Sequence, residues 1–293
     1  MIGMNFTGGQ AQAWPSEVTH VRLWDNGVAW RNIHTAVDTY DWTLLDALVD
    51  KAAGKTIVYT VGGCPQWLAK YPDQPYYAPW LGPGSNSMPW SMDEANKFFW
   101  NLATRYAGRI KAYEIWNEPQ LADFLYPYNV TECNALATMT KRAYSTIKAC
   151  DPNALVLAAS VLPRTSSGGM TRAQKYLTAL QSAGWNIDAF TTHIYPEVGY
   201  WAPKRKTMLN DVVATITAMN PPTTKLWITE TLFGLLGPEL TDPTALDTAV
   251  SGLYTNDGGR FVFWYAWDRP DLGGSYLGPN SPTWESIKVR HTL

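Results

Sequence analysis

Residues 154–161, with the sequence ALVLAASV, form a short and continuously apolar run that is typical of a strand buried on both faces. Similar runs start at residues 189 (AFTTHIY), 225 (KLWITET) and 260 (RFVFWYAW), so the strand starts recur every 35 or 36 residues. This spacing leaves room for one strand and one helix in each unit. A chain that alternates strands and helices in this way favours a parallel sheet with helices packed against it.

The same alternation extends back to the beginning of the chain. Four earlier strand candidates lie at residues 2–7, 20–25, 56–62 and 110–117. Amphipathic stretches that we expect to be helices lie at residues 42–53, 91–107, 131–149, 170–183, 204–219 and 242–255. Eight strands in alternation with helices predict an α/β fold, a closed (β/α)8 TIM barrel that occupies residues 1–293 as a single domain.

Two details refine this architecture. The first two strands start 18 residues apart, which predicts a reduced first helix. Long insertions follow the third and eighth strands, at residues 64–90 and 268–283. Both follow the carboxyl ends of strands, the face at which barrel enzymes build their active sites. A doubly wound open sheet is the alternative fold, but no GxGxxG motif follows the first strand to support it.

The composition is poor in charge and rich in aromatic side chains. Charged residues make up 16% of the 293 residues, and there are 15 Trp and 16 Tyr. The high apolar content and a formal net charge of -2 exclude a disordered chain and give no positive field for a nucleic acid. No stretch reaches the roughly 18 apolar residues of a membrane-spanning helix. We therefore expect a partner that aromatic rings recognise, and neither a nucleic acid nor a membrane.

The beginning of the chain and the cysteines bear on its compartment. The start, MIGMNFTGGQ, lacks the basic and apolar regions of a secretion signal, so we expect a cytoplasmic protein, a trimmed mature form or part of a larger, cell-wall-directed or extracellular protein. Cys64, Cys133 and Cys150 show no CxxC spacing and are expected to be three packed, unpaired thiols. The oligomeric state stays open.

The motif with the most chemical content is YEIWNEP, residues 113–119. Its Glu118 comes at the end of the fourth predicted strand, and Glu230 ends the seventh. Because the carboxyl ends of parallel strands meet at one mouth of a barrel, we expect these acids to lie close together. Cleavage of a glycosidic bond needs such a pair, in which one acid protonates the departing oxygen and the other attacks the anomeric carbon. Glu114 lies deeper in the fourth strand and is expected to pair with a buried base, for which Arg22 is a candidate.

Asn117-Glu118-Pro119 on strand four, together with Glu230 on strand seven, resembles the clan A retaining glycoside hydrolases. The run YEIWNEPQLADFLYP around Glu118 is most similar to the family of β-xylosidases and α-L-iduronidases, although the Gly-Pro segment of that family at strand five is replaced by Ala158-Ala159-Ser160. The resemblance implies a retaining glycosidase in which Glu118 is the acid/base and Glu230 the nucleophile. It also implies that Asn117 holds the sugar 2-hydroxyl group.

Further residues are assigned to substrate binding by the same resemblance and by strand register. Clan A barrels place an arginine against the nucleophile, and a tryptophan on strand eight forms the floor under the attacked sugar. Aromatic residues of the 64–90 insertion add stacking surface, because sugar C–H groups pack on aromatic rings. The expected substrate-binding residues are Arg22, Asn117, His193, Tyr195, Trp264 as the first choice for the floor, Trp267 as the second, and Trp67. His193 is equally compatible with a role as a hydrogen-bonded core histidine.

The expected partner is an oligosaccharide or polysaccharide, and no cofactor or metal is expected. Exo and endo action both remain open, while the spread of aromatic residues over several loops favours an endo-acting enzyme. The alternative function is a carbohydrate-binding barrel or adhesin domain without turnover. A metal-dependent hydrolase is disfavoured, because His20, His34, His193 and His291 are scattered and no HExxH or HxH motif occurs.

Overall fold

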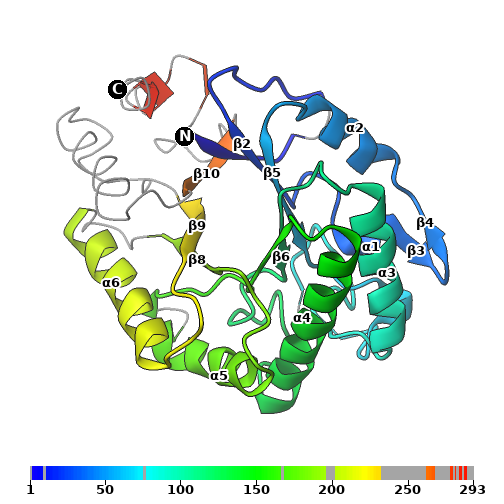
Figure 1. Ribbon diagram of the computed structural model, residues 1–293, viewed down its shortest axis with the longest axis vertical. Helices are drawn as coiled ribbons and strands as arrows, with labels where there is room; N and C mark the ends of the chain where they lie inside the picture. The colour runs from blue at the N-terminus through cyan, green and yellow to red at the C-terminus, as the bar shows by residue number, and fades with distance from the viewer. Residues whose placement is uncertain are drawn as a thin grey trace.

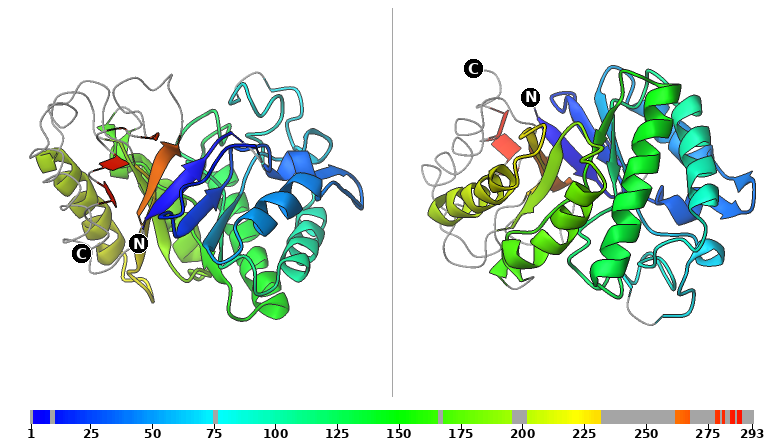
Figure 2. Two further views of the ribbon diagram at one scale, coloured as in Figure 1. Left: turned by 90° about the horizontal axis from the view of Figure 1, so that it is seen from above. Right: turned by 60° about the horizontal axis from the view of Figure 1, so that its bottom comes forward.

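Eight parallel strands are arranged as a ring with helices around it (Figure 1). The structure is a computed structural model that describes residues 2–8, 11–74, 77–165, 168–195, 202–231, 262–267, 278–279, 281, 284–285 and 287–288. The described helices lie outside the ring of strands in all three views (Figures 1 and 2).

The ring is built from strands at all eight positions that the sequence predicts. They are β1 (Gly3–Phe6), β2 (His20–Leu23), β5 (Thr56–Val61), β6 (Ala112–Ile115), β7 (Leu155–Leu157), β8 (Phe190–Ile194), β9 (Leu226–Thr231) and β10 (Val262–Trp267). Their order is β7-β6-β5-β2-β1-β10-β9-β8. Parallel bridges from Leu157 to Ala189 and from Val161 to Thr192 join the two ends of this sheet. The chain therefore has the (β/α)8 TIM barrel fold.

The helices also follow the predicted pattern. They are α1 (Trp30–Ile33), α2 (Thr43–Lys51), the 3-10 turn η1 (Gln66–Leu68), α3 (Met92–Arg105), α4 (Val130–Cys150), α5 (Gly169–Ser182) and α6 (Ala202–Ala218). A small antiparallel hairpin, β3 (His34–Ala36) and β4 (Thr39–Tyr40), is added beside α1. Residues 11–19, between β1 and β2, form only turns, as expected for a reduced first helix. The helix expected at residues 242–255 lies outside the described residues.

The barrel interior has an apolar layer at one level and a polar layer above it. Six residues fill the apolar layer: Val58, Ala112, Leu157, Ala189, Trp227 and Phe263. Gly3 makes room for the Phe263 ring, because a Cβ atom on Gly3 would lie 2.8 Å from that ring. The polar layer is completely buried and includes Arg22, Glu114 and Thr229. This polar layer supports the mouth of the barrel at the carboxyl ends of the strands.

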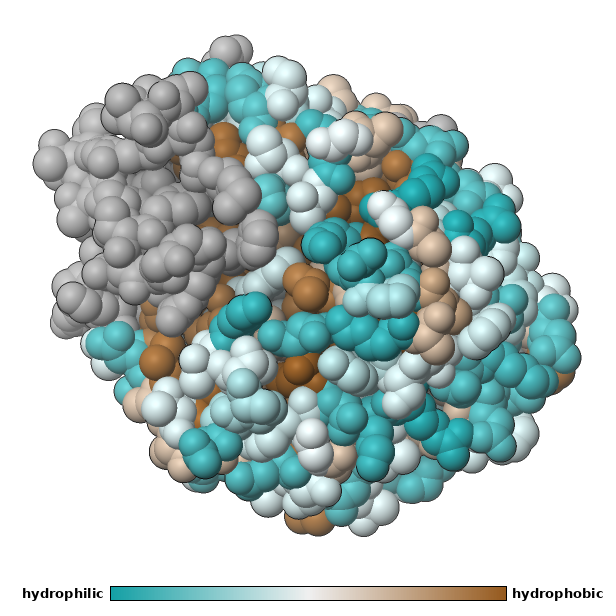
Figure 3. Space-filling view, in the orientation of Figure 1, coloured by the Kyte–Doolittle hydropathy of each residue, from teal (hydrophilic) through white to brown (hydrophobic). Residues whose placement is uncertain are grey.

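The surface and the cysteines agree with the composition. The face in Figure 3 mixes hydrophilic and apolar side chains, with apolar atoms visible near its centre. Cys64 and Cys133 are buried and Cys150 is half-buried, and all three are free thiols, as expected. Within the described part of the chain, no helix combines the length and apolarity that crossing a bilayer requires.

Candidate active site

The turn after β6 directs Asn117 and Glu118 into the mouth of the barrel. Trp116 and Glu118 both have left-handed backbones, with φ of 84° and 39°. Non-glycine residues rarely adopt this conformation, and it concentrates at functional sites. The Trp116 ring packs into the core, where its Nε1 donates to the Phe124 carbonyl at 2.7 Å. The Glu118 amide donates to Ser160 Oγ at 3.1 Å, which connects the turn to the segment that follows β7.

A β-bulge near the end of β9 directs Glu230 to the same mouth. Thr192 of β8 is opposite Ile228, but the next residue, His193, is opposite Glu230, so Thr229 is an extra residue in β9. A bulge of this kind changes the direction of the side chains that follow it. Thr229 and Glu230 can therefore both face the interior although they are consecutive in a strand.

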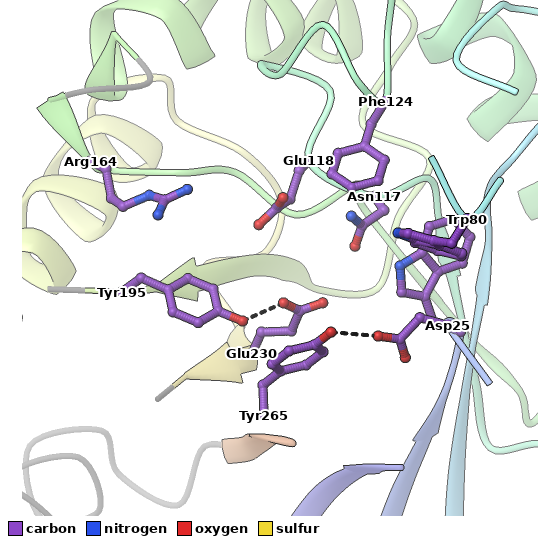
Figure 4. A pocket seen from close by; sticks show the side chains of 10 residues that line it. Asp25, Trp80, Asn117, Glu118, Phe124, Arg164, Tyr195, Glu230 and Tyr265 are labelled. Carbon is purple, nitrogen blue, oxygen red and sulfur yellow. Dashed lines mark hydrogen bonds between the residues drawn. The ribbon is translucent and has the colours of Figure 1, made fainter. Parts of the chain in front are cut away.

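Glu118 and Glu230 line one wall and the floor of a pocket of about 320 Å³ (Figure 4). An oxygen of each carboxyl group and a ring nitrogen of His193 all lie within 4.8 Å of one another. The pocket is lined by Trp24, Asp25, Trp80, Asn117, Glu118, Phe124, Arg164, Tyr195, Glu230 and Tyr265. The structure thus brings together the two acids that the sequence singled out.

Arg22 is the buried cation that organises this pocket from below. Its Nε and Nη2 atoms donate to Glu114 Oε2 at 2.9 and 2.6 Å. Nη1 donates to Glu230 Oε1 at 2.5 Å, and Nη2 also donates to Asn117 Oδ1 at 2.8 Å. Burial opposes the charge of Arg22, but Glu114 and Glu230 outweigh burial and raise its pKa. Arg22 is therefore a permanent cation that pairs with Glu114, as expected, and also orients Glu230 and Asn117.

Tyr195 completes the hydrogen bonding of Glu230. Its hydroxyl group donates to Glu230 Oε2 at 2.5 Å (Figure 4). Burial, with the nearby charges of Glu230 and Glu118, raises the pKa of Tyr195 well above its usual value, so this phenol remains a donor. Both oxygens of Glu230 thus accept hydrogen bonds, one from Arg22 and one from Tyr195.

A chain of hydrogen bonds connects Glu114 to Glu118 through Thr229 and His193. Burial raises the pKa of Glu114. The charge of Arg22 and the hydrogen bonds that Glu114 accepts have the larger, opposite effect, so the pKa of Glu114 lies below its usual value. Glu114 is therefore an acceptor, and the Thr229 hydroxyl donates to it at 2.8 Å. Thr229 Oγ1 then accepts from His193 Nε2 at 3.1 Å. In a neutral imidazole this makes Nδ1 an acceptor, 2.7 Å from Glu118 Oε1. With this tautomer of the ring, the carboxyl group of Glu118 would be the donor in the hydrogen bond between them.

His193 itself is fully buried and lies behind the two acids. It contacts Glu118 and Thr229, and its Nδ1 lies 3.4 Å from Glu230 Oε2. Among the roles open to it in the sequence, the structure favours the hydrogen-bonded core histidine over direct substrate contact.

The sequence predicts Trp264 as the floor of the sugar site, but the structure places this residue elsewhere. It is fully buried and packs in the outer core with the helices. Phe263 faces the barrel interior, so the alternation of β10 directs the side chain of Tyr265 inward and that of Trp264 outward. Tyr265 therefore lines the pocket in place of Trp264.

Trp267 and Trp67 are also outside this pocket. The Trp267 ring packs edge-on against Trp284, with the ring centroids 4.9 Å apart. The Trp67 ring is half-buried, and its Nε1 donates to the His34 carbonyl at 2.9 Å. Both rings are held by packing contacts away from the acids. The 64–90 insertion contributes Trp80 to the pocket instead. Most of the 268–283 insertion lies outside the described residues.

A metal ion would find one group of ligands among the residues that the structure describes, formed by Glu118, His193 and Glu230. Both Glu230 oxygens already accept from Arg22 and Tyr195, at 2.5 Å each. The guanidinium of Arg22 would also repel a second cation at this carboxylate. The donor set therefore fits a metal ion poorly and fits a pair of acid catalysts well.

Five pocket residues were not singled out from the sequence: Trp24, Asp25, Phe124, Arg164 and Tyr265. Trp24 and Asp25 directly follow β2, and Arg164 lies in the segment after β7. Their position after strand ends is the signal that could have found them, because the carboxyl ends of barrel strands carry the active site. Phe124 follows Glu118 by six residues in the same loop.

Comparisons with known proteins give likenesses in structure only. No family profile matches the chain, and no curated protein sequence matches it. A monomeric β-xylosidase from Caulobacter crescentus CB15 superposes with a TM-score of 0.71 at 20% identity, covering 100% of this chain and 67% of that one. A GH39 enzyme from Xanthomonas axonopodis pv. citri gives a TM-score of 0.69 at 20% identity, covering 100% and 65%. Xylanase 10B from Thermotoga maritima gives 0.65 at 14% identity, covering 99% and 94%.

The chain spans about two thirds of the length of the first two proteins and nearly all of the xylanase. The likeness to these enzymes agrees with the resemblance of the sequence to clan A glycoside hydrolases. The comparisons show that this chain has the (β/α)8 barrel fold that these glycoside hydrolases share.

Proposed function

We propose that this protein is a retaining glycoside hydrolase, with Glu118 as acid/base and Glu230 as nucleophile. The observation that carries the proposal is the separation of the two acids, whose nearest oxygens lie within 4.8 Å together with His193. Retaining pairs lie about 5–5.5 Å apart, whereas inverting pairs lie about 6.5–9.5 Å apart to admit a water molecule. The short separation supports retention.

In the first step, Glu230 attacks the anomeric carbon and forms a covalent ester with the sugar. The glycosidic C–O bond breaks, and the departing oxygen takes the proton of Glu118. Arg22 and Tyr195 present Glu230 as a carboxylate for this attack, while His193 binds the protonated form of Glu118. Asn117 accepts from Arg22 with Oδ1, so its amide N–H group is left to bind the sugar 2-hydroxyl.

In the second step, water displaces Glu230 from the sugar. Glu118, now a carboxylate, removes a proton from the water while the water oxygen bonds to the anomeric carbon, and Glu230 leaves as a carboxylate. Two displacements at one carbon restore its original configuration. The enzyme then regains its starting protonation state, with the proton on Glu118.

The substrate class follows from the pocket and from the structural neighbours. The pocket combines aromatic rings with carboxyl and amide groups, as sugar sites do. The neighbours' names identify them as β-xylosidases and xylanases. Aryl β-xylosides and xylo-oligosaccharides are therefore the substrates that we propose to test first.

The decisive test is Glu230→Ala with an aryl glycoside and azide. We expect kcat to fall at least about 1,000-fold, because no ester can form. Azide should restore turnover by attacking the anomeric carbon from the side that the shortened residue leaves open. The aryl group departs, and the product is a glycosyl azide of inverted configuration, which NMR identifies. Glu17→Ala removes an exposed carboxylate and serves as the matched control with unchanged kcat.

Two results would overturn the proposal. A folded Glu230→Ala variant that no azide concentration rescues would contradict the role of nucleophile. Wild-type protein that binds xylo-oligosaccharides but releases no product over long incubation would favour a binding domain instead.

A further inference from the structure

Asp25 is a carboxylic acid in the pocket wall that the proposed reaction leaves without a role. It directly follows Trp24 after β2, and both residues line the pocket. Its Oδ2 accepts from the Tyr265 hydroxyl at 2.7 Å (Figure 4). Its Oδ1 is buried and has no hydrogen-bond partner. A buried acceptor without a hydrogen-bond donor is energetically unfavourable, so a ligand group that donated to Oδ1 would be bound favourably there.

The position of Asp25 identifies which part of a substrate could supply that partner. Figure 4 shows Asn117, Trp80 and Asp25 on one side of Glu118, and Arg164 on the other. A sugar with its anomeric carbon at Glu230 and its 2-hydroxyl at Asn117 extends toward Asp25. The departing group leaves past Glu118, toward Arg164. Asp25 therefore faces the sugar that is transferred to the enzyme, on the edge away from its anomeric carbon.

We propose that Asp25 is the residue that recognises this sugar, by accepting a hydrogen bond from a hydroxyl group at C3 or C4. The inference rests on the proposed function. Tyr265 holds Oδ2 and so fixes the position of Oδ1, the oxygen that is left as the acceptor.

The rings around Asp25 fit the other faces of the same sugar. Trp24 and Trp80 meet edge to face, with centroids 5.3 Å apart. Trp24 is buried, whereas Trp80 is 51% exposed and can pack against a bound ring. A polar acceptor beside apolar rings is the usual composition of a sugar site, in which rings bind C–H groups and the acceptor binds hydroxyls.

Burial has the largest effect on the pKa of Asp25. Burial and the negative charge of Glu230 raise the pKa of Asp25 to about 6, against the opposing effects of Tyr265 and Arg22. A hydroxyl group that donates to Asp25 would stabilise its charged form, so substrate binding should lower the pKa of Asp25.

Asp25→Asn, which preserves the size of the side chain, tests the proposal with aryl β-xylosides. The probes are 4-nitrophenyl β-D-xyloside and its 3-deoxy and 4-deoxy derivatives. We expect kcat/KM for the parent xyloside to fall about 10- to 100-fold, the value of a hydrogen bond to a charged group. For the derivative that lacks the recognised hydroxyl, wild type and variant should differ less than about threefold, because the interaction is already absent.

Asp123→Asn is the matched control, because it removes an exposed carboxylate next to Phe124 without lining the pocket. It should leave kcat/KM for all three probes unchanged. An equal loss on all three probes with Asp25→Asn would overturn the proposal, since Asp25 would then act through Tyr265 or Glu230. A loss below threefold on the parent would overturn it as well.

A binding measurement separates this proposal from the proposed function. Trp24 and Trp80 line the pocket, so we expect xylotriose to change the intrinsic tryptophan fluorescence. Asp25→Asn should raise the Kd for xylotriose at least about tenfold, whether or not wild type cleaves it. Binding without turnover would contradict the hydrolase alone, whereas an unchanged Kd or an absence of binding to wild type would contradict the role of Asp25.

Discussion

Glu114 and Glu230 bind the same guanidinium group, yet the structure treats them differently. Glu114 is fully buried and accepts from two nitrogens of Arg22, from Thr60 at 2.7 Å and from Thr229 at 2.8 Å. Glu230 accepts from Arg22 and Tyr195, is 6% exposed and lines the pocket. Glu114 is thus part of the buried polar layer, whereas Glu230 lies at the edge of this layer and lines the pocket.

Within this hydrogen-bond network, Glu114 has a structural role, and Glu230 has the role in the proposed reaction. Glu114 has its hydrogen-bonding capacity filled by protein groups, so it has none left for a substrate. Its charge holds Arg22 in place, and Arg22 in turn orients Glu230 and Asn117. Removing Glu114 should therefore act first on the fold, whereas removing Glu230 should act first on turnover.

Glu114→Gln should give the largest change in stability. It leaves the buried Arg22 with less compensation for its charge, which typically costs about 3–5 kcal/mol in the free energy of unfolding. Chemical denaturation followed by circular dichroism measures this loss.

Glu230→Gln is the matched comparison, since it removes a carboxylate from the same arginine. We expect less than about 1 kcal/mol of destabilisation here, because Arg22 keeps Glu114 and the pocket side is open to water. Equal losses of unfolding free energy in the two variants would show that both acids stabilise the fold to the same extent, which would contradict the difference in role between them.

Thr229→Val tests whether Glu114 also acts on Glu118 through His193. Loss of the hydroxyl removes the acceptor that keeps the proton on His193 Nε2. The ring can then carry its proton on Nδ1 and donate to Glu118, which favours the ionised acid. We expect kcat/KM to fall about tenfold at neutral pH and the alkaline limb of its pH profile to move to lower pH.

Thr60→Val is the control for this effect, because Thr60 donates to Glu114 at 2.7 Å and belongs to the same buried layer. It should lower stability by a similar amount and leave the shape of the pH profile unchanged. A profile that moves equally in both variants would indicate a general disturbance of the polar layer and would sink the idea of a specific connection.

The sequence predicted the elements that obey periodicity and missed those that depend on register. Eight apolar runs of strand length in alternation with helices were enough for the barrel. Glu118, Glu230 and Arg22 were found because strand ends and strand interiors can be counted. The helix predicted at residues 131–149 begins at Val130, because Asn129 is its N-cap and accepts from the Glu132 amide at 2.9 Å. Several polar residues near a helix start can satisfy such an orphan amide, so local composition alone does not fix the boundary.

The sequence also did not predict which aromatic side chains of β10 face the pocket. Whether Trp264 or Tyr265 faces inward depends on the registers of β1 and β9 with β10, which both contain shifts. A one-residue difference in register exchanges the two faces of a strand, so the abundance of tryptophan in β10 was misleading. Asp25 and Arg164 lie in segments without periodicity, where only the folded barrel brings them to the acids.

Asp25 is a third carboxyl group against which the two acids can be compared, and its removal should stabilise the protein at neutral pH, whereas removal of either acid should destabilise it. Burial and Glu230 raise its pKa to about 6 in the folded state, against about 3.9 for an unfolded aspartate. The folded state thus holds this proton more tightly, so its contribution to stability is present below about pH 4 and is lost as the pH rises to about 6. When the pH is raised from 4 to 7, the free energy of unfolding of Asp25→Asn should therefore increase by about 1–2 kcal/mol relative to that of wild type, as measured by denaturant unfolding. Repeating the pair in a Glu230→Gln background should shrink the gain, because repulsion from Glu230 is one of its causes; a gain of the same size would mean that burial alone sets the pKa of Asp25.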